Sequence, residues 1–317
     1  MTQNQTTRLR FFPFGETFEA GMGGRTLLKD EALIDIDRPH YAAEVALKRR
    51  LLEASPHEYF SGGVSLLDAQ WGVLELVLTD LTEHYPESFR LERRGRERCW
   101  HNLLLDEEQA FIWGDAASLT LEPLDWAGRQ VQEDLVLVSA DADAAFVGGQ
   151  LCFPNGWAIA DRLGRSFMTI HERTPTTTMP SVHAGTRLLS VMKPGKTLWR
   201  MSWNFKLTDQ LDLSTKHKPR YKADFALRAP LLTPDTAGRE VFVRIERQTF
   251  TRLPNSAHVL FGIHTYNSRL ETEAADPERA RRILAVIQGA PENVKRYKAI
   301  TPIEAAMTMF LEEKAHG

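Results

Sequence analysis

Hydrophobic positions recur with helical spacing in the first part of the chain. In residues 41–52 and 65–81, apolar side chains return every three or four residues, as they do on one face of an α-helix. Tyr85-Pro86 ends the second segment, because proline disfavours helical backbone in the residue before it. Residues 114–128 show the same spacing more weakly. The pattern predicts that residues 34–127 are mostly helical.

From about residue 130 the spacing changes to that of β-strands. Alternating or continuous apolar runs predict five strands, at residues 135–139, 144–153, 199–207, 241–250 and 258–266. The turn signal Leu253-Pro254-Asn255-Ser256 separates the last two and predicts an antiparallel hairpin. Residues 209–235 have the poorest pattern, and we expect a surface excursion there. Because helices do not follow each strand, the pattern indicates an antiparallel α+β sheet.

Three zones follow from this pattern. A loop and helical region, residues 1–127, is expected to pack on a sheet region, residues 128–272. Residues 273–317 should then form two helices, one capped and started by Asp276-Pro277 and one started by Pro302. We expect the three zones to form one continuous globular unit.

Composition narrows the class of protein. The chain has 317 residues, 43% of them hydrophobic and 26% charged, which is typical of a globular protein. A net charge of −3 gives no general attraction to nucleic acid or to an anionic membrane. The sequence shows neither a membrane-spanning run nor a secretory signal, so we expect a cytoplasmic protein. Two cysteines, Cys99 and Cys152, suggest a reducing compartment.

Several chemistries lack their sequence motifs. The chain contains no P-loop, GxGxxG, HExxH, GxSxG or CxxC motif. Its ten histidines never show metal-pair spacing on a helix face, and two cysteines alone cannot hold an iron–sulfur cluster or a structural zinc. We therefore expect no mononuclear metal site built from several side chains, and no flavin or iron–sulfur group carried by this chain.

The predicted strand around Glu246 has a polar face. Alternation places three polar side chains together on it, Arg244, Glu246 and Gln248, whereas Arg247 points to the other face. One interpretation is a solvated face with a surface ion pair. The other is a polar patch that lines a cavity, where Glu246 binds a cation or transfers protons. The residues alone leave both open.

Other strands also offer polar side chains to a common face. Arg200, Ser202 and Asn204 share one face of their strand. His264 and Tyr266 share one face of theirs, and His264 could face the same pocket as Glu246. Polar residues on several neighbouring strands favour a concave, partly polar pocket.

His171 is the most informative histidine. It follows Phe167, Met168 and Ile170, so its ring should emerge from an apolar wall. A haem iron needs an imidazole in such a place, but a packed core histidine has the same surroundings and is the commoner case. His183, expected in a loop, is a weaker candidate.

A series of short motifs runs through most of the chain: Phe12-Pro13-Phe14, Met22-Gly23, Gln132-Glu133-Asp134-Leu135, Cys152-Phe153-Pro154-Asn155-Gly156-Trp157, Ile170-His171, Arg244-Ile245-Glu246-Arg247-Gln248 and Phe261-Gly262-Ile263-His264-Thr265-Tyr266. In their order and spacing they resemble the haem-dependent oxidative N-demethylase family. The resemblance extends from Phe12 to Tyr266. The chain departs from the family pattern at residues 172–175, after the histidine, and at His264, where the family has arginine.

The resemblance implies a PAS-like fold, an antiparallel sheet with flanking helices that holds haem b. It implies oxidative removal of a methyl group, as formaldehyde, from a small secondary amine such as dimethylamine. Electrons would come from NAD(P)H through partner subunits that carry FMN and an iron–sulfur cluster. By position, His171 would bind the haem iron and Glu246 the substrate ammonium, with His264 and Tyr266 as further catalytic candidates. Three arginines would contact the haem propionates or line the pocket: Arg200, Arg244 and Arg247.

Two other functions stay open at this point. The chain could be a non-catalytic PAS-like sensor that binds haem or another small molecule. It could also be a haem-free structural subunit of the same complex, in which His171 is only a core residue. We expect no nucleic-acid or membrane partner.

Overall fold

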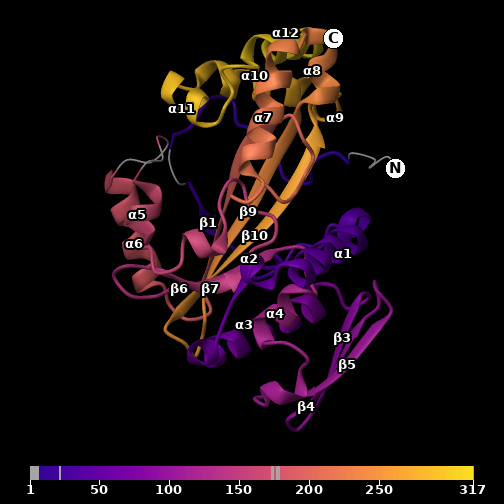
Figure 1. The fold of residues 1–317 in the computed structure, drawn as a ribbon, viewed down its shortest axis with the longest axis vertical. Coiled ribbons are helices and arrows are strands. Elements are labelled where there is room, and N and C mark those ends of the chain that lie inside the picture. The colour runs from indigo at the N-terminus through magenta and orange to yellow at the C-terminus, as the bar shows by residue number, and fades with distance from the viewer. Residues whose placement is uncertain (1–6, 21–22, 173–174, 176–178, 317) are drawn as a thin grey trace.

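A seven-stranded antiparallel sheet is the centre of the computed structural model, which describes residues 7–20, 23–172, 175 and 179–316 (Figure 1). Met22 is part of a motif that resembles the demethylase family, and residues 173–174 are part of a departure from the family pattern. These residues lie outside the described part of the chain. The strand order is β1-β8-β9-β10-β6-β7-β2. Helices pack around this sheet, so the predicted α+β class is confirmed.

All five predicted strands are present. The sheet consists of β1 (Arg25–Thr26), β2 (Phe60–Ser61), β6 (Asp134–Ser139), β7 (Phe146–Gln150), β8 (Thr197–Lys206), β9 (Phe242–Arg252) and β10 (His258–Arg269). The predicted hairpin is formed by β9 and β10, and β6 pairs with β7 as expected. The three longest strands, β8, β9 and β10, lie side by side, and their pairing register decides which side chains share a face.

The N-terminal region is less helical than its pattern predicts. Its helices are α1 (Arg38–Ala54), α2 (Pro56–Tyr59), α3 (Leu67–His84) and α4 (Pro123–Gly128). Both strongly periodic helices are confirmed, and the second ends before Tyr85 as expected. Between α3 and α4, however, a second sheet is formed by β3 (Phe89–Arg94), β4 (Glu97–Asn102) and β5 (Glu107–Ile112). The prediction of a mostly helical stretch is wrong there, because Phe89, Trp100 and Phe111 pack from strand positions into the core.

Two groups of helices flank the sheet. Beside the cavity described below lie α5 (Phe167–His171), α6 (Met179–Val191) and α7 (Lys218–Arg228). A second group gathers at one end of the molecule, opposite the three-stranded sheet (Figure 1): α8 (Pro234–Glu240), α9 (Leu270–Ala274), α10 (Pro277–Gly289), α11 (Glu292–Tyr297) and α12 (Glu304–His316). The two predicted C-terminal helices are α10 and α12.

Residues 209–235 are not a simple surface excursion as predicted, because α7 forms there and lines the cavity. Among the described residues, none of the helices is both long and apolar enough to span a membrane.

Both faces of the main sheet are buried. Along β6, Leu135 and Leu137 join a core with α3 and α4, whereas Val136 and Val138 join a core with α5 and α6. A buried ion pair ties α1 to the sheet: Lys48 Nζ lies 3.6 Å from Asp134 Oδ1, and both side chains are fully buried. The Asp134 carboxylate also accepts the N–H groups of Cys152 and Phe153. These contacts fix the end of β7 and the chain that leads toward α5.

Gly149 allows β7 to approach β6. Its φ of +143° is unusual for other residues, and an added Cβ would lie 2.6 Å from the Leu135 carbonyl oxygen and from Val136 Cα. Gly149→Ala should therefore lower the free energy of unfolding by about 2–4 kcal/mol, measured by urea denaturation. Gly164→Ala is the control, because Gly164 has a φ of +73° but open space around it. It should cost about 1 kcal/mol. Equal losses in the two variants would contradict the steric argument.

Candidate functional site

A cavity of about 1030 Å³ lies on one face of the main sheet. Three strands form its floor with alternate side chains: Arg200, Ser202 and Asn204 of β8, Glu246, Gln248 and Phe250 of β9, and Phe261 and Ile263 of β10. Helix α5 forms one wall with His171, and α7 forms another with Tyr221. This is the concave, partly polar pocket that the strand pattern predicts.

His171 reaches the cavity as the last residue of a short helix. The hydroxyl of Ser166 caps α5 by accepting the Thr169 N–H, and the Phe167 ring packs against the imidazole at a centroid distance of 4.1 Å. His171 Nδ1 lies 2.9 Å from the Phe167 carbonyl oxygen. Because a carbonyl only accepts hydrogen bonds, Nδ1 carries the proton and the lone pair of the neutral ring is on Nε2.

The electrostatic surroundings keep His171 neutral. Burial lowers the pKa of its imidazole below the ordinary value, and the charges of Arg200 and Arg162 lower it further. A neutral ring whose other nitrogen donates to a backbone carbonyl is the usual state of a metal-binding histidine. The side chain therefore has the chemistry that a haem iron requires.

Glu246 lies in the cavity floor within a hydrogen-bonded chain. Gln248 Nε2 donates to Glu246 Oε2 over 2.8 Å, and Arg200 Nε donates to Gln248 Oε1 over 2.8 Å. Glu246 and Gln248 are buried. The interpretation of this polar strand face as a solvated surface is therefore wrong. A buried carboxylate that an amide holds in place can bind a cation from the cavity.

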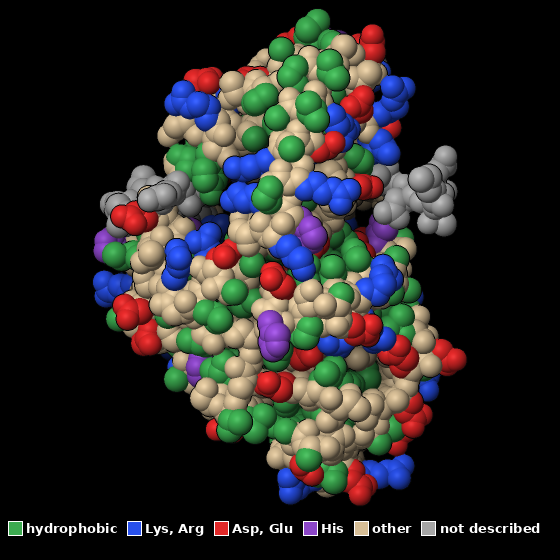
Figure 2. Space-filling model, in the orientation of Figure 1, with side chains coloured by type: hydrophobic (Ala, Val, Ile, Leu, Met, Phe, Trp, Pro, Cys, Tyr) green, Lys and Arg blue, Asp and Glu red, His purple; other side chains and the backbone are tan. Residues whose placement is uncertain are grey.

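The cavity carries an excess of positive charge. Among the residues that the structure describes, seven cationic side chains line it: Arg162, Arg165, Arg200, Lys206, Lys218, Lys222 and Lys298. Three acidic side chains of the described residues do so: Glu172, Asp224 and Glu246. Figure 2 shows Lys and Arg side chains gathered around α7 on this face of the molecule. Burial lowers the pKa of Lys206 and of Lys298 to about 8. Such a lining attracts a ligand that carries carboxylates.

Arg244 does not line the cavity, although it shares a strand face with Glu246. Its guanidinium donates to four backbone carbonyls, those of Phe153, Pro154, Gln210 and Leu211. The side chain is only 1% exposed. The expected contact between Arg244 and a haem propionate is therefore corrected: its donors join two chain segments behind the cavity.

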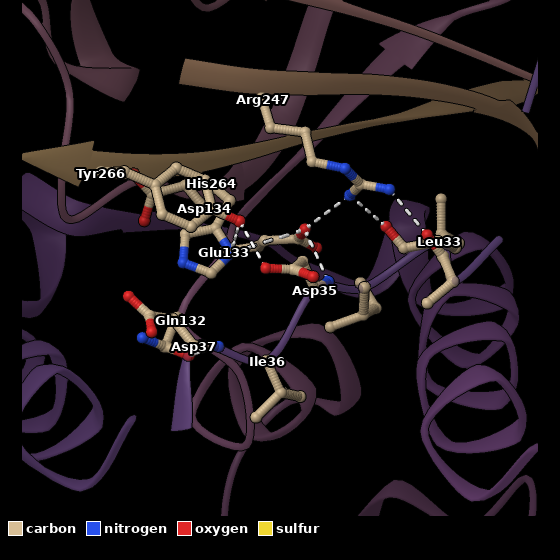
Figure 3. Close-up of polar contacts among 12 residues, drawn as sticks. Leu33, Asp35, Ile36, Asp37, Gln132, Glu133, Asp134, Arg247, His264 and Tyr266 are labelled. Atoms are coloured by element: carbon tan, nitrogen blue, oxygen red, sulfur yellow. Dashed lines mark hydrogen bonds and ion pairs between the residues drawn. The ribbon is translucent and has the colours of Figure 1, made fainter. Parts of the chain in front are cut away.

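Three further predicted site residues lie on the opposite face of the sheet (Figure 3): Arg247, His264 and Tyr266. In the register of β9 and β10, His264 pairs with Arg247, and Thr265 pairs with Glu246. Because neighbouring residues on a strand point to opposite faces, His264 cannot share the cavity with Glu246. The prediction of one common pocket is wrong for these three residues.

They form a buried polar cluster with Asp35 and Glu133. The Tyr266 hydroxyl donates to Asp35 Oδ2 over 2.7 Å and lies 3.0 Å from His264 Nδ1. Arg247 donates to Glu133 Oε1 over 3.2 Å and to the carbonyls of residues 32 and 33. These contacts bind the segment before α1 to the sheet.

Burial changes the protonation of this cluster. It raises the pKa of Glu133 to about 8 and lowers the pKa of His264 well below its ordinary value. Glu133 Oε2 and His264 Nε2 are buried and have no hydrogen-bond partner within the described part of the chain. Near neutral pH, therefore, His264 is uncharged and Glu133 holds its proton for much of the time.

Sequence reasoning missed several residues of the cavity wall. Lys206 continues the alternation of Arg200, Ser202 and Asn204, so strand spacing could have revealed it. Arg162 and Lys298 come from segments that only the tertiary structure brings to the cavity. His183, expected in a loop, is exposed on α6 and is not part of the cavity lining.

The fold places this cavity between one face of the main sheet and the helices α5 and α7. A family model described as haem-dependent oxidative N-demethylase, alpha subunit-like, matches residues 24–308. The chain belongs to this family. The family description indicates a haem-dependent oxidoreductase of the oxidative N-demethylase type that works within a multi-subunit enzyme.

The raised pKa of Glu133 predicts how stability depends on pH. Between the ordinary carboxyl value of 4.5 and about 8, the folded chain holds a proton that the unfolded chain has released. Stability from this group therefore falls as pH rises through that range, by at most about 1.4 kcal/mol per pH unit. Glu133→Gln should flatten this part of the profile, measured by urea denaturation between pH 5 and 8. Glu83→Gln, at an exposed position on α3, is the control. An unchanged slope in Glu133→Gln would contradict the assignment.

Proposed function

We propose that the cavity holds haem b and that His171 Nε2 binds its iron. The observation that carries this proposal is the placement of His171 in one wall of a cavity whose floor contains Glu246. The volume of about 1030 Å³ is at the upper end of the range for small-molecule sites, as a ligand of porphyrin size requires. When bound, haem supplies the activation of O₂.

The cavity lining offers apolar side chains to the porphyrin ring of haem and cationic side chains to its propionates. Apolar side chains offer a surface to the porphyrin ring: Phe146, Phe167, Ile170, Phe250, Phe261 and Ile263. Arg162 and Arg200 are the cations whose charges reach His171, and we assign them to the propionates. The PAS-like description of the sheet belongs to this proposal, and the helices α5 and α6 over one sheet face support it.

Glu246 would bind the substrate. Within a cavity that is otherwise mostly cationic, its buried carboxylate offers a partner to an alkylammonium ion. Gln248 fixes the carboxylate, so a small secondary methylamine would be held in one orientation, which raises the rate by proximity. Glu246 would also accept the ammonium proton, leaving the neutral amine that is oxidised.

The overall reaction needs electrons that this chain does not supply. A secondary methylamine, O₂, two electrons and two protons give a primary amine, formaldehyde and water. The C–H bond of the methyl group becomes C–OH, and the resulting carbinolamine releases formaldehyde as its C–N bond breaks. Because the chain carries no flavin or iron–sulfur motif, we propose that NAD(P)H donates through partner subunits with FMN and an iron–sulfur cluster.

Replacing His171 tests the haem site. His171→Ala should remove most of the haem from the purified protein, because it deletes the iron ligand, and the Soret band would be lost. His183→Ala, at an exposed position on α6, should keep its full haem content. Circular dichroism would show that both variants are folded. A folded His171→Ala protein with a normal Soret band would refute the assignment.

Replacing Glu246 tests the substrate site separately. Glu246→Gln should keep haem but lose at least about 100-fold of the amine-dependent formaldehyde release, assayed with a reductase and NAD(P)H, because the neutral amide no longer pairs with the ammonium. Asp224→Asn, on α7 at the cavity edge, is the control and should stay active. Unchanged turnover in Glu246→Gln would exclude the assigned role. Bound haem without formaldehyde release from any short methylated amine would instead favour a sensor.

A further inference from the structure

A second group of metal-ligating side chains lies on the three-stranded sheet, away from the cavity. Among the described residues, Cys99, His101 and Glu108 can bring one ligand atom each within 4.8 Å of one another. Cys99 and His101 lie two residues apart on β4, so they point to the same face of the sheet. Glu108 of β5 pairs with His101 and joins them on that face.

The separations of Cys99 and His101 from the two Glu108 oxygens are in the range found between ligands of a tetrahedral zinc ion. Zinc bonds of 2.0–2.3 Å at tetrahedral angles place neighbouring ligand atoms about 3.3–3.8 Å apart. Cys99 Sγ lies 3.4 Å from Glu108 Oε1, and His101 Nδ1 lies 3.3 Å from Glu108 Oε2. A small rotation of the exposed Glu108 side chain would therefore let one metal ion take a ligand from each residue.

A fourth side chain, Glu92, lies within ion-pair distance of the other ring nitrogen of His101. His101 Nε2 lies 3.6 Å from Glu92 Oε1, while Arg94 donates to the other Glu92 oxygen over 3.1 Å. Metal-binding histidines usually direct their second nitrogen to such a carboxylate. With Nε2 turned to Glu92, Nδ1 is the nitrogen directed at Cys99 and Glu108.

The opposite face of the sheet makes the group rigid. Trp100, between the two β4 ligands, is buried, stacks on Phe89 at 5.5 Å and donates to Gln130. The backbone positions of Cys99 and His101 are thereby fixed. A preformed arrangement of ligands lowers the entropic cost of binding.

We propose that Cys99, His101 and Glu108 form a binding site for a zinc-type divalent cation, with Glu92 as the partner of His101. A thiolate and an imidazole favour zinc over magnesium or calcium, which prefer oxygen ligands. Three protein ligands leave a fourth position that faces solvent, because Glu108 is exposed. The sequence-based expectation of no multi-ligand metal site considered helix spacing, whereas these ligands come from two paired strands.

Zinc binding to the haem-loaded protein tests this proposal. After chelator treatment, the protein should bind one zinc ion per chain in competition with a chromogenic chelator. Cys99→Ser, His101→Gln and Glu108→Gln should each weaken the affinity at least tenfold, and Glu92→Gln should weaken it by about 10–100-fold. Iron content and the Soret band should stay constant, which separates this site from the haem site.

Thiol labelling gives a second readout. Cys152 is fully buried, so an alkylating reagent should react with Cys99 in the native protein, and zinc should slow this reaction. His57→Gln and Glu83→Gln, at exposed positions elsewhere, are the matched controls and should bind zinc normally. The proposal is overturned if zinc binds with unchanged affinity in all ligand variants, or if folded wild-type protein shows neither stoichiometric binding nor protection of Cys99.

Discussion

Strand β9 carries ionisable side chains on both of its faces, and both faces are buried. A buried charge must be paired or hydrogen-bonded within its own surroundings, so each face needs its own set of partners. Glu246 has Gln248 and the charge of Arg200 on one face, whereas Arg247 has Glu133 and two carbonyls on the other. A register slip of one residue would turn Glu246 and Arg247 to the opposite faces, and it would separate Arg247 from Glu133 and Glu246 from Arg200. The pairing of β9 with β8 and β10 therefore determines the site.

The two polar sets differ in what they can do. The set around Glu246 opens into a cavity, where a ligand can complete its electrostatic balance. The set around Glu133 lies on the opposite face of the sheet from the cavity. Its hydrogen bonds connect Glu133 and Arg247 to the segment before α1. Burial raises the pKa of Glu133 to about 8; the charge of Arg247 lowers it, and the nearby carboxylates of Asp35 and Asp80 raise it. A longer cationic side chain at position 264 would pair with Glu133 and lower the pKa of its carboxyl group.

Periodicity predicted the elements that bury a continuous apolar face, such as α1, α3 and the five predicted strands of the main sheet. It failed for β3, β4 and β5, because their exposed faces carry so many Arg and Glu residues that the alternation of Phe89, Leu91 and Trp100 is obscured. For the site, alternation correctly grouped Arg200 with Ser202 and Asn204. Alternation within a single strand does not show which faces of neighbouring strands lie on the same side of the sheet, because that depends on the pairing register. For this reason the predicted placement of His264 in the same pocket as Glu246 is wrong. Strand alternation also cannot predict Arg162 and Lys298, because only the tertiary structure brings their segments to the cavity.

The charge distribution in the cavity links its two proposed ligands. In the chain alone, Arg200, Lys206 and Lys298 all act on the Glu246 carboxylate and compete with an incoming ammonium ion. Propionates would draw such cations away from Glu246, because oppositely charged groups in a buried site interact strongly. The Glu246 carboxylate would then interact more strongly with a small cation. Under the proposed function, the cations that hold the haem would therefore leave the Glu246 carboxylate more available to the alkylammonium substrate.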